Sequence, residues 1–198
     1  MAAPEGPCLN LVIVFDSSAS LDFDHQNGYA YVKNFVTTLT KQYHSVNSSR
    51  TRNFGVVHFS DSAAILVPYD NYSGNVQTPL KLIEMSKHLD GATNVPQALE
   101  IAVEMVGNTP QSEYGIVFLT DGGSNKGGMS GDEKVKEVLE SGHSFFAIFL
   151  SQQFPDEQGA MRGKMNDENE LYLQTFQELE NEENIRWALD KVCQPAVC

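Results

Sequence analysis

Short apolar runs alternate with segments of helical periodicity, and this alternation constrains the fold more than any other feature of the sequence. The apolar runs lack the strict in-out alternation of strands with one wet face, so we expect strands covered on both sides. They lie at residues 11–15, 54–59, 63–67, 114–119, 144–150 and, more weakly, 171–176. Helical stripes fall within residues 32–43, 95–106, 135–139 and 185–192. The pattern predicts an α/β, doubly wound, Rossmann-like sheet with helices on both faces.

One connection breaks the alternation. Only Ser60-Asp61-Ser62 separates the second apolar run from the third, which is too short for a crossover helix. These two strands should therefore form an antiparallel hairpin at a sheet edge. The expected sheet is six-stranded and mostly parallel, with one antiparallel edge strand.

The length and charge of the chain limit its organisation and its partners. A chain of 198 residues fits one sizeable domain, and we expect that domain at residues 8–193. Residues 1–7 look like a cloning-derived N-terminal extension, and residues 194–198 look like a tail leading to a following module. The net charge of -13 would repel nucleic acid and anionic lipid. No apolar run approaches the ~18 residues that insert across a bilayer.

The cysteines lie at the domain boundaries. Cys8 precedes the first strand, and Cys193 ends the last helical stripe. This placement fits a disulfide that joins the two ends of the domain in an oxidising compartment, with free cytosolic thiols as the alternative. Cys198 is either paired outside this sequence or competes with Cys193 for Cys8. The triplets Asn47-Ser48-Ser49 and Asn71-Tyr72-Ser73 fit the N-glycosylation sequon in polar loop sequence.

Oxygen-bearing side chains cluster where the strands end. Sites in open α/β sheets form beyond the carboxyl ends of the strands, where the strand order reverses. Asp16, Ser18 and Ser20 follow the first strand, Thr93 lies in a loop before a helix, and Asp121 follows the fourth strand. Hydroxyl and carboxylate oxygens without histidine or cysteine suit a hard cation such as Mg2+, although Mn2+ or Ca2+ would also fit.

These motifs together carry a resemblance. Asp-x-Ser-x-Ser after a first apolar strand, threonine in Gly-x-Thr-Asn, and Thr-Asp-Gly after the fourth strand resemble the von Willebrand factor type A domain with its metal-ion-dependent adhesion site. The resemblance implies that Ser18, Ser20 and Thr93 touch the metal, while Asp16 and Asp121 act mostly through waters. The cation then seeks an acidic side chain on a partner. The ending of the chain resembles the A domains of apicomplexan thrombospondin-related adhesive proteins.

The sequence departs from the family pattern at a few positions. Ala19 stands where glycine is frequent, and its methyl group should favour a right-handed helical start. Ala92 likewise replaces a second glycine. Asp22 and Asp24 resemble the adjacent metal site of integrin β-type domains, but Phe23 interrupts the paired acids. Acids near a helix start, where the helix dipole favours them, explain the pair more simply.

The sequence favours a non-enzymatic function. We expect an extracellular or cell-surface domain of a larger multidomain protein, which binds a host or matrix protein or an acidic glycan. Its affinity would follow the position of the last helix, although a disulfide between Cys8 and Cys193 would limit movement of that helix. An intracellular scaffold domain is the alternative. A hydrolase is disfavoured because Asp16-Ser17-Ser18, after the first strand, forms neither a Gly-x-Ser-x-Gly elbow nor the Asp-x-Asp motif of an aspartyl-phosphate site.

Overall fold

The computed structural model describes residues 8–25, 27–46, 52–122, 130–150 and 166–193. The strands are β1 (Asn10–Asp16), β2 (Asn53–Phe59), β3 (Ala63–Asn71), β4 (Tyr114–Thr120), β5 (Ser144–Leu150) and β6 (Glu170–Leu173). The α-helices are α1 (Gly28–Val46), α2 (Gln77–Met85), α3 (Val95–Val106), α4 (Gly131–Glu140) and α6 (Glu182–Val192). Short 3-10 helices are η1 (Ala19–His25), η2 (Gln111–Glu113), η3 (Asp167–Asn169) and η4 (Phe176–Glu180).

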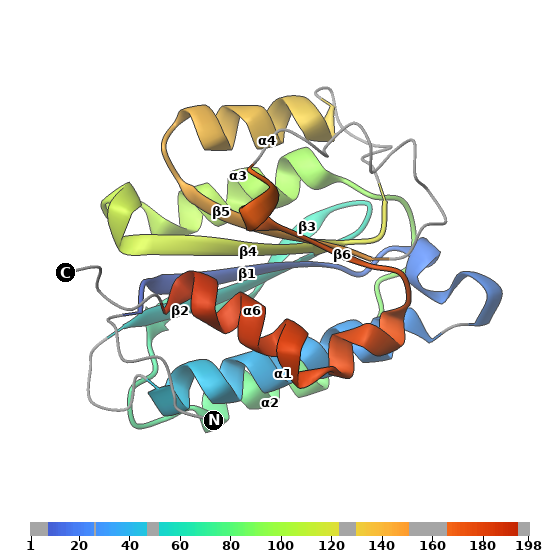
Figure 1. Cartoon of the computed structure of the whole chain (residues 1–198), viewed down its shortest axis with the longest axis horizontal. Helices are drawn as coiled ribbons and strands as arrows, with labels where there is room; N and C mark the ends of the chain where they lie inside the picture. Colours follow the sequence, from blue (N-terminus) through green and yellow to red (C-terminus); the bar gives the residue numbers. More distant parts are fainter. Residues whose placement is uncertain (1–7, 26, 47–51, 123–129, 151–165, 194–198) are drawn as a thin grey trace.

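The strands form one sheet in the order β3-β2-β1-β4-β5-β6. All neighbouring strands are parallel except β3, which pairs with β2 in the antiparallel sense at the edge. Helices α3 and α4 cover one face of the sheet, and α1, α2 and α6 cover the other (Figure 1). The predicted fold class, including its antiparallel edge strand, is confirmed.

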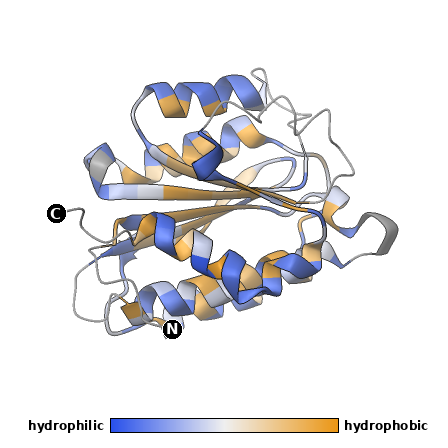
Figure 2. Ribbon diagram, in the orientation of Figure 1, coloured by the Kyte–Doolittle hydropathy of each residue, from blue (hydrophilic) through white to orange (hydrophobic). Residues whose placement is uncertain are grey.

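Two apolar layers explain why the strand sequences do not alternate. Along β1, Leu11, Ile13 and Phe15 join the core beneath α1 and α6, whereas Val12 and Val14 join the core beneath α3 and α4. Every residue of β1 is buried. In Figure 2 the strands in the middle of the sheet are largely hydrophobic, while many hydrophilic residues lie on the helices. A strand buried on both faces must be apolar at odd and even positions alike.

The ends of the domain are joined covalently. Cys8 and Cys193 form a disulfide, which is the pairing expected from their positions in the sequence. Beside it, the Leu9 N–H donates to the Val192 carbonyl at 2.7 Å. The start of β1 and the end of α6 are therefore fastened together. The extension at residues 1–7 and the tail at residues 194–198, which includes Cys198, lie outside the described residues.

Some elements differ from their predicted bounds. Helix α2 was not predicted, and β3 runs on to Asn71 beyond the expected end at residue 67. The weak last strand ends at Leu173, because Phe176 instead begins the 3-10 helix η4. The acidic run at residues 178–183 covers the end of η4 and the first turn of α6.

Candidate metal centre

The candidate site lies where β1 and β4 end side by side. Strand β1 pairs with β2 on one side and with β4 on the other, so the strand order reverses between β1 and β4. Polar residues that follow parallel strands meet at the same edge. Asp16, the last residue of β1, is fully buried, and Asp121, directly after β4, is 1% exposed. Two carboxylates are thus held out of water at one sheet edge.

Hydrogen bonds connect four of the five predicted residues. The Ser18 N–H donates to Asp16 Oδ1 at 2.8 Å, and the Ser18 and Ser20 hydroxyls lie 3.0 Å apart. The Ser20 hydroxyl donates to Asp121 Oδ1 at 2.8 Å. The structure therefore brings together, in one contiguous chain of contacts, oxygens separated by a hundred positions in the sequence.

Thr93, the fifth residue, is held beside this chain through its loop. The Ala19 N–H donates to the Gly91 carbonyl, and the Asp90 N–H donates to the Ser17 carbonyl. The Ser17 hydroxyl also accepts from the Leu89 N–H. Thr93 itself is buried, at 4% exposure. Its loop is therefore fastened directly to the backbone that carries Ser18 and Ser20.

Gly91 is required by the backbone of that loop. Its φ of +107° lies in the left-handed region, where side chains are strained. A Cβ added there would lie 2.6 Å from Asp61 Oδ2. Asp61 comes from the turn between β2 and β3, and its Oδ1 accepts the Ala92 N–H at 3.1 Å. The absence of a side chain at Gly91 lets this carboxylate order the backbone next to Thr93.

Asp16 is a buried carboxyl group with no cationic partner among the described residues. Burial raises its pKa above the ordinary value, against hydrogen bonds from Ser18 and Thr120 that lower it. The Thr120 hydroxyl donates to Asp16 Oδ2 at 2.7 Å. Within the described part of the chain, no lysine or arginine forms an ion pair with Asp16. A buried carboxylate without a cationic partner fits a divalent cation, and the neighbouring hydroxyls are oxygen donors of the kind that Mg2+ prefers.

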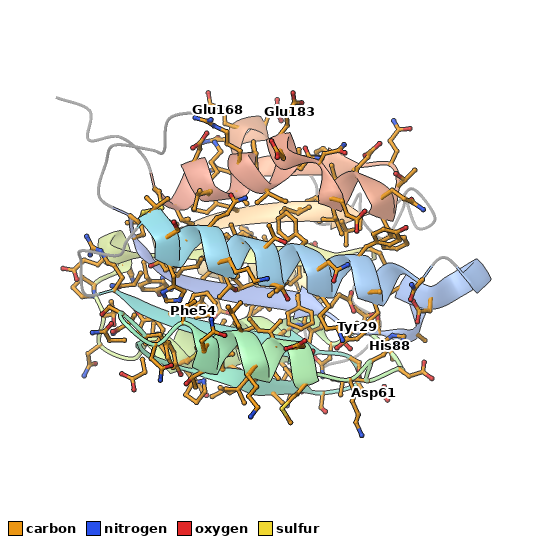
Figure 3. All side chains as sticks on the ribbon, turned by 90° about the horizontal axis from the view of Figure 1, so that it is seen from below. Tyr29, Phe54, Asp61, His88, Glu168 and Glu183 are labelled. Carbon is orange, nitrogen blue, oxygen red and sulfur yellow. A yellow bond between two sulfur atoms is a disulfide. The ribbon has the colours of Figure 1, made fainter. Side chains whose placement is uncertain are left out.

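Four residues at this site were given no metal-binding role from the sequence: Ser17, Asp61, His88 and Thr120. His88 contacts three other residues. Its Nε2 lies 2.9 Å from the Ser18 carbonyl oxygen, its Nδ1 lies 3.1 Å from Asp22 Oδ2, and its ring stacks on Tyr29 at 4.8 Å (Figure 3). The only sequence signal was its place in the loop before Gly91. Its role depends on which loops the fold brings together.

The same contacts account for Asp22. Its Oδ1 accepts the Tyr29 N–H near the start of α1, and its Oδ2 faces His88. This agrees with the simpler interpretation of an acid near a helix start. Among the described residues, no group of three or more histidine, cysteine, aspartate or glutamate side chains could hold a metal ion. The side chain of Asp24 lies outside the described residues. Ala19 begins the 3-10 helix η1, as its methyl group predicts.

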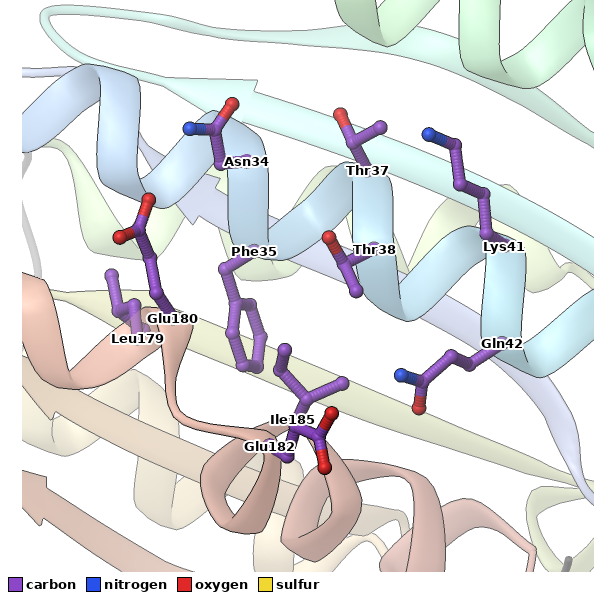
Figure 4. A pocket seen from close by; sticks show the side chains of 10 residues that line it. All are labelled: Asn34, Phe35, Thr37, Thr38, Lys41, Gln42, Leu179, Glu180, Glu182 and Ile185. Atoms are coloured by element: carbon purple, nitrogen blue, oxygen red, sulfur yellow. The ribbon is translucent and has the colours of Figure 1, made fainter.

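A hollow of about 410 Å³ lies elsewhere, between α1 and the segment formed by η4 and α6. Phe35 and Ile185 are among its apolar residues, and Lys41 and Glu180 are among its polar ones (Figure 4). It contains none of the residues predicted for the site. Its walls belong to the helical layer and not to the strand ends, so it is a separate feature of the molecule.

Comparisons with known proteins agree with this architecture. A family model of the von Willebrand factor type A domain matches residues 10–184. The human collagen alpha-6(VI) chain is 24% identical over 174 residues, which are 85% of this chain and 7% of the collagen chain. Proximal thread matrix protein 1 from the mussel byssus superposes with a TM-score of 0.77 at 23% identity, covering 95% of this chain and 48% of that one.

A further structure of the mussel protein is described as having a zinc-occupied MIDAS motif, where MIDAS denotes the metal-ion-dependent adhesion site. It superposes with a TM-score of 0.76 at 22% identity, covering 95% of this chain and 48% of that one. The chain thus spans about half of the mussel protein and a small part of the collagen chain. In the described part of the chain, every helix is too short or too polar to traverse a bilayer.

Proposed function

The chain belongs to the von Willebrand factor type A domain family, and from this we propose that it is an extracellular adhesion domain that docks an acidic group of its partner through a divalent cation. The partner is a host or matrix protein, or an acidic glycan. Mg2+ is the cation that best suits the oxygen set, with Mn2+ or Ca2+ as substitutes. The cation would be held by Asp16, Ser18, Ser20, Thr93 and Asp121.

One observation carries the proposal. The Ser20 hydroxyl, which follows β1, donates a hydrogen bond to Asp121, which follows β4, and further contacts connect Ser20 to Ser18 and Asp16. Two carboxylates balance the charge of a divalent ion, and hydroxyl groups add none. When bound, the cation supplies a positive centre that accepts a carboxylate or sulfate oxygen. Because the protein contributes no third carboxylate to this set, an incoming anionic group meets little repulsion from the site itself.

The residues around the set keep its members in place. The Ser18 N–H and the Thr120 hydroxyl each donate to a different oxygen of Asp16, which fixes the plane of that carboxylate. The contacts between residues 17–19 and residues 89–91 hold the Thr93 loop against the Ser18 loop. Because these contacts already hold the metal-binding side chains in place, fewer side chains have to become ordered when the cation binds.

Two observations support an extracellular setting. The Cys8–Cys193 disulfide suits an oxidising compartment, whereas the alternative of an intracellular scaffold domain suits free thiols. The relatives at sequence and structure level include a collagen chain and a mussel byssus protein. The resemblance to apicomplexan adhesive proteins stays a prediction.

The test is cation-dependent binding to chemically defined surfaces. The chain should bind immobilised poly-glutamate or heparin in Mg2+ and lose that binding in EDTA. Asp121→Ala should abolish the Mg2+-dependent part, whereas Asp167→Ala removes an exposed aspartate in η3 and should bind like the parent. Circular dichroism checks that both variants fold. Equal binding in Mg2+ and EDTA would refute the proposed adhesion mechanism.

A thiol count tests the compartment. Protein isolated from its natural source should show no free thiol at Cys8 or Cys193 when it is alkylated before reduction. Alkylation of both cysteines without reduction would favour the scaffold function instead.

A further inference from the structure

The end of β3 carries an acceptor triplet that the adhesion site does not use. Asn71-Tyr72-Ser73 fits the pattern Asn-x-Ser, with a middle residue other than proline. Asn71 and Ser73 are exposed, as are Gly74 and Asn75 after them. The triplet therefore lies on the surface of the folded domain, where a large hydrophilic substituent has room.

The local hydrogen bonds leave the side-chain nitrogen of Asn71 available. The Ser73 N–H donates to Asn71 Oδ1 at 2.8 Å, and the Ser73 hydroxyl donates to the same oxygen. Among the described residues, none accepts a hydrogen bond from Asn71 Nδ2. The amide oxygen is thus polarised by two donors, while the amide nitrogen is uncommitted.

The position of Asn71 is compatible with adhesion at the opposite end of the strand. Along the antiparallel pair, Phe59 lies opposite Ala63, whereas Asn53 lies opposite Asn71. The Phe59 carbonyl accepts the Ser17 N–H, so the Phe59 end is the end next to the candidate metal site. Six residue steps along β2 place Asn71 about 20 Å from that end. A substituent on Asn71 would leave the docking face clear.

A substituent there would also protect the sheet edge. Strand β3 is an edge strand, and its Ile65 is 50% exposed. Exposed edge strands invite pairing with other chains, and bulky hydrophilic groups at the edge oppose it. In the described part of the chain, no strand pairs with β3 on its outer side.

We propose that Asn71 is an N-linked glycosylation site, an inference that rests on the extracellular part of the proposed function. The donor is a lipid-linked oligosaccharide pyrophosphate. Asn71 Nδ2 attacks the anomeric carbon of its first sugar, forming the C–N bond as the C–O bond to pyrophosphate breaks. The lipid pyrophosphate leaves, and a base of the transferase takes one amide proton. No oxidation or reduction is involved.

The test is site-resolved glycan mapping of the full chain, secreted from a cultured animal cell behind a heterologous signal peptide. Peptide N-glycosidase in heavy-oxygen water converts each glycosylated asparagine to labelled aspartate, which mass spectrometry locates. Label is expected at Asn71 in the parent chain. It should be lost in Asn71→Gln and in Ser73→Ala, which keeps the asparagine. It should persist in Asn75→Gln, an exposed neighbour outside any sequon, and in Asn47→Gln, whose sequon lies outside the described residues.

An unlabelled Asn71 in secreted, disulfide-bonded protein would overturn the assignment, as would label that survives Ser73→Ala. The result is separable from the adhesion mechanism. Asp121→Ala should keep the glycan on Asn71, and enzymatic removal of the glycan should leave Mg2+-dependent binding to poly-glutamate unchanged. Loss of cation-dependent binding with the glycan intact would count against the adhesion mechanism alone.

Discussion

At the scale of single residues, His88 connects three segments of the chain next to the candidate site. One ring nitrogen meets the Ser18 carbonyl, the other meets Asp22, and the ring stacks on Tyr29 at the start of α1. The imidazole thus ties the loop before Thr93 to the loop that carries Ser18 and Ser20. Because it touches the backbone and not the predicted metal-binding oxygens, we interpret it as a positioning residue.

Replacing His88 should weaken Mg2+ binding more than it weakens the fold. His88→Phe keeps a ring for Tyr29 but loses both nitrogen contacts, and we expect the dissociation constant for Mg2+ to rise about tenfold, as for other residues that orient metal ligands. His88→Gln can still donate to the Ser18 carbonyl and should recover most of the affinity. Isothermal titration calorimetry measures both variants.

Tyr29→Phe is the matched control for that experiment, since it keeps the ring that stacks on His88 and removes only the hydroxyl contacts with Ser86 and Ser17. It should bind Mg2+ like the parent. Parent-like affinity in His88→Phe, or equal weakening in His88→Phe and His88→Gln, would show that His88 contributes packing only.

The limits of sequence reasoning at this scale are visible in Thr120. Asp16, Ser18 and Ser20 were found from the sequence because residues two apart in extended chain point the same way. Thr120 was quoted within the Thr-Asp-Gly motif, but its contact with Asp16 was not predicted, because its hydroxyl reaches Asp16 only when β4 lies beside β1 in the observed register. Asp61 and His88 likewise act across loops whose contacts no local pattern encodes.

A second prediction at residue scale concerns pH. Burial lowers the pKa of His58 below its ordinary value of 6.5, and within the described protein its Nδ1 has no hydrogen-bond partner. As the pH falls below that value, the unfolded chain binds a proton that the folded chain resists. Stability should therefore fall as the pH drops from about 6.5 toward the lowered pKa of the folded state.

His58→Phe should flatten this dependence, because a phenyl ring can still pack against Phe15 without titrating. Urea unfolding between about pH 7 and pH 5 measures the slope in both proteins. Some slope should remain, since burial also lowers the pKa of His44 and His143. Parallel stability curves for parent and variant would exclude His58 as a source of the pH dependence.

At the scale of elements, length and burial decide which segments the sequence reveals. Helices α1 and α3 were predicted because each shows an apolar stripe over three or more turns. Helix α2 was missed because it has nine residues, with Pro79 in its first turn and only Leu80 and Ile83 to mark its buried side. Strand β6 has four residues, so its end could not be told from the start of η4.

The fastening of α6 to β1 is the element-scale feature with the largest expected energy. The disulfide closes a loop between residues 185 positions apart, and removing a disulfide of this kind costs about 2–5 kcal/mol. Cys8→Ala/Cys193→Ala should unfold at a temperature lower by about 4–20 °C, given 2–4 °C per kcal/mol for a chain of this length. Differential scanning calorimetry provides the measurement.

Cys198→Ala serves as the control for the disulfide variant, because it removes the cysteine that lies outside the described residues. It should melt like the parent. An unchanged melting temperature in the double variant would mean that the hydrogen bond between Leu9 and Val192, together with core packing, holds α6 without the covalent bond.

At the scale of the whole molecule, the two ends of β1 have different tasks. Asp16 ends the strand at the candidate metal site, and Cys8 precedes its start at the disulfide. Six residue steps place these ends about 20 Å apart. If α6 slid along the sheet to set the affinity for the partner, the metal site at one end of β1 would be coupled to the disulfide at the other end. The covalent bond at the end of α6 opposes such a slide, so we expect the affinity to be set by the loops themselves.

A thermodynamic cycle tests whether the two ends are independent. Mg2+ at about one hundred times its dissociation constant should stabilise the parent by about 2.7 kcal/mol, because it binds only the folded state. The same increment, within about 0.5 kcal/mol, is expected in Cys8→Ala/Cys193→Ala, since distant sites without shared partners add. Asp121→Ala should lose the stabilisation by Mg2+ yet keep the stabilisation that the disulfide provides. A change of more than about 1 kcal/mol in this increment on removal of the disulfide would contradict the expectation. It would mean that Mg2+ binding and the disulfide are coupled through α6, and that the position of α6 helps to set the affinity.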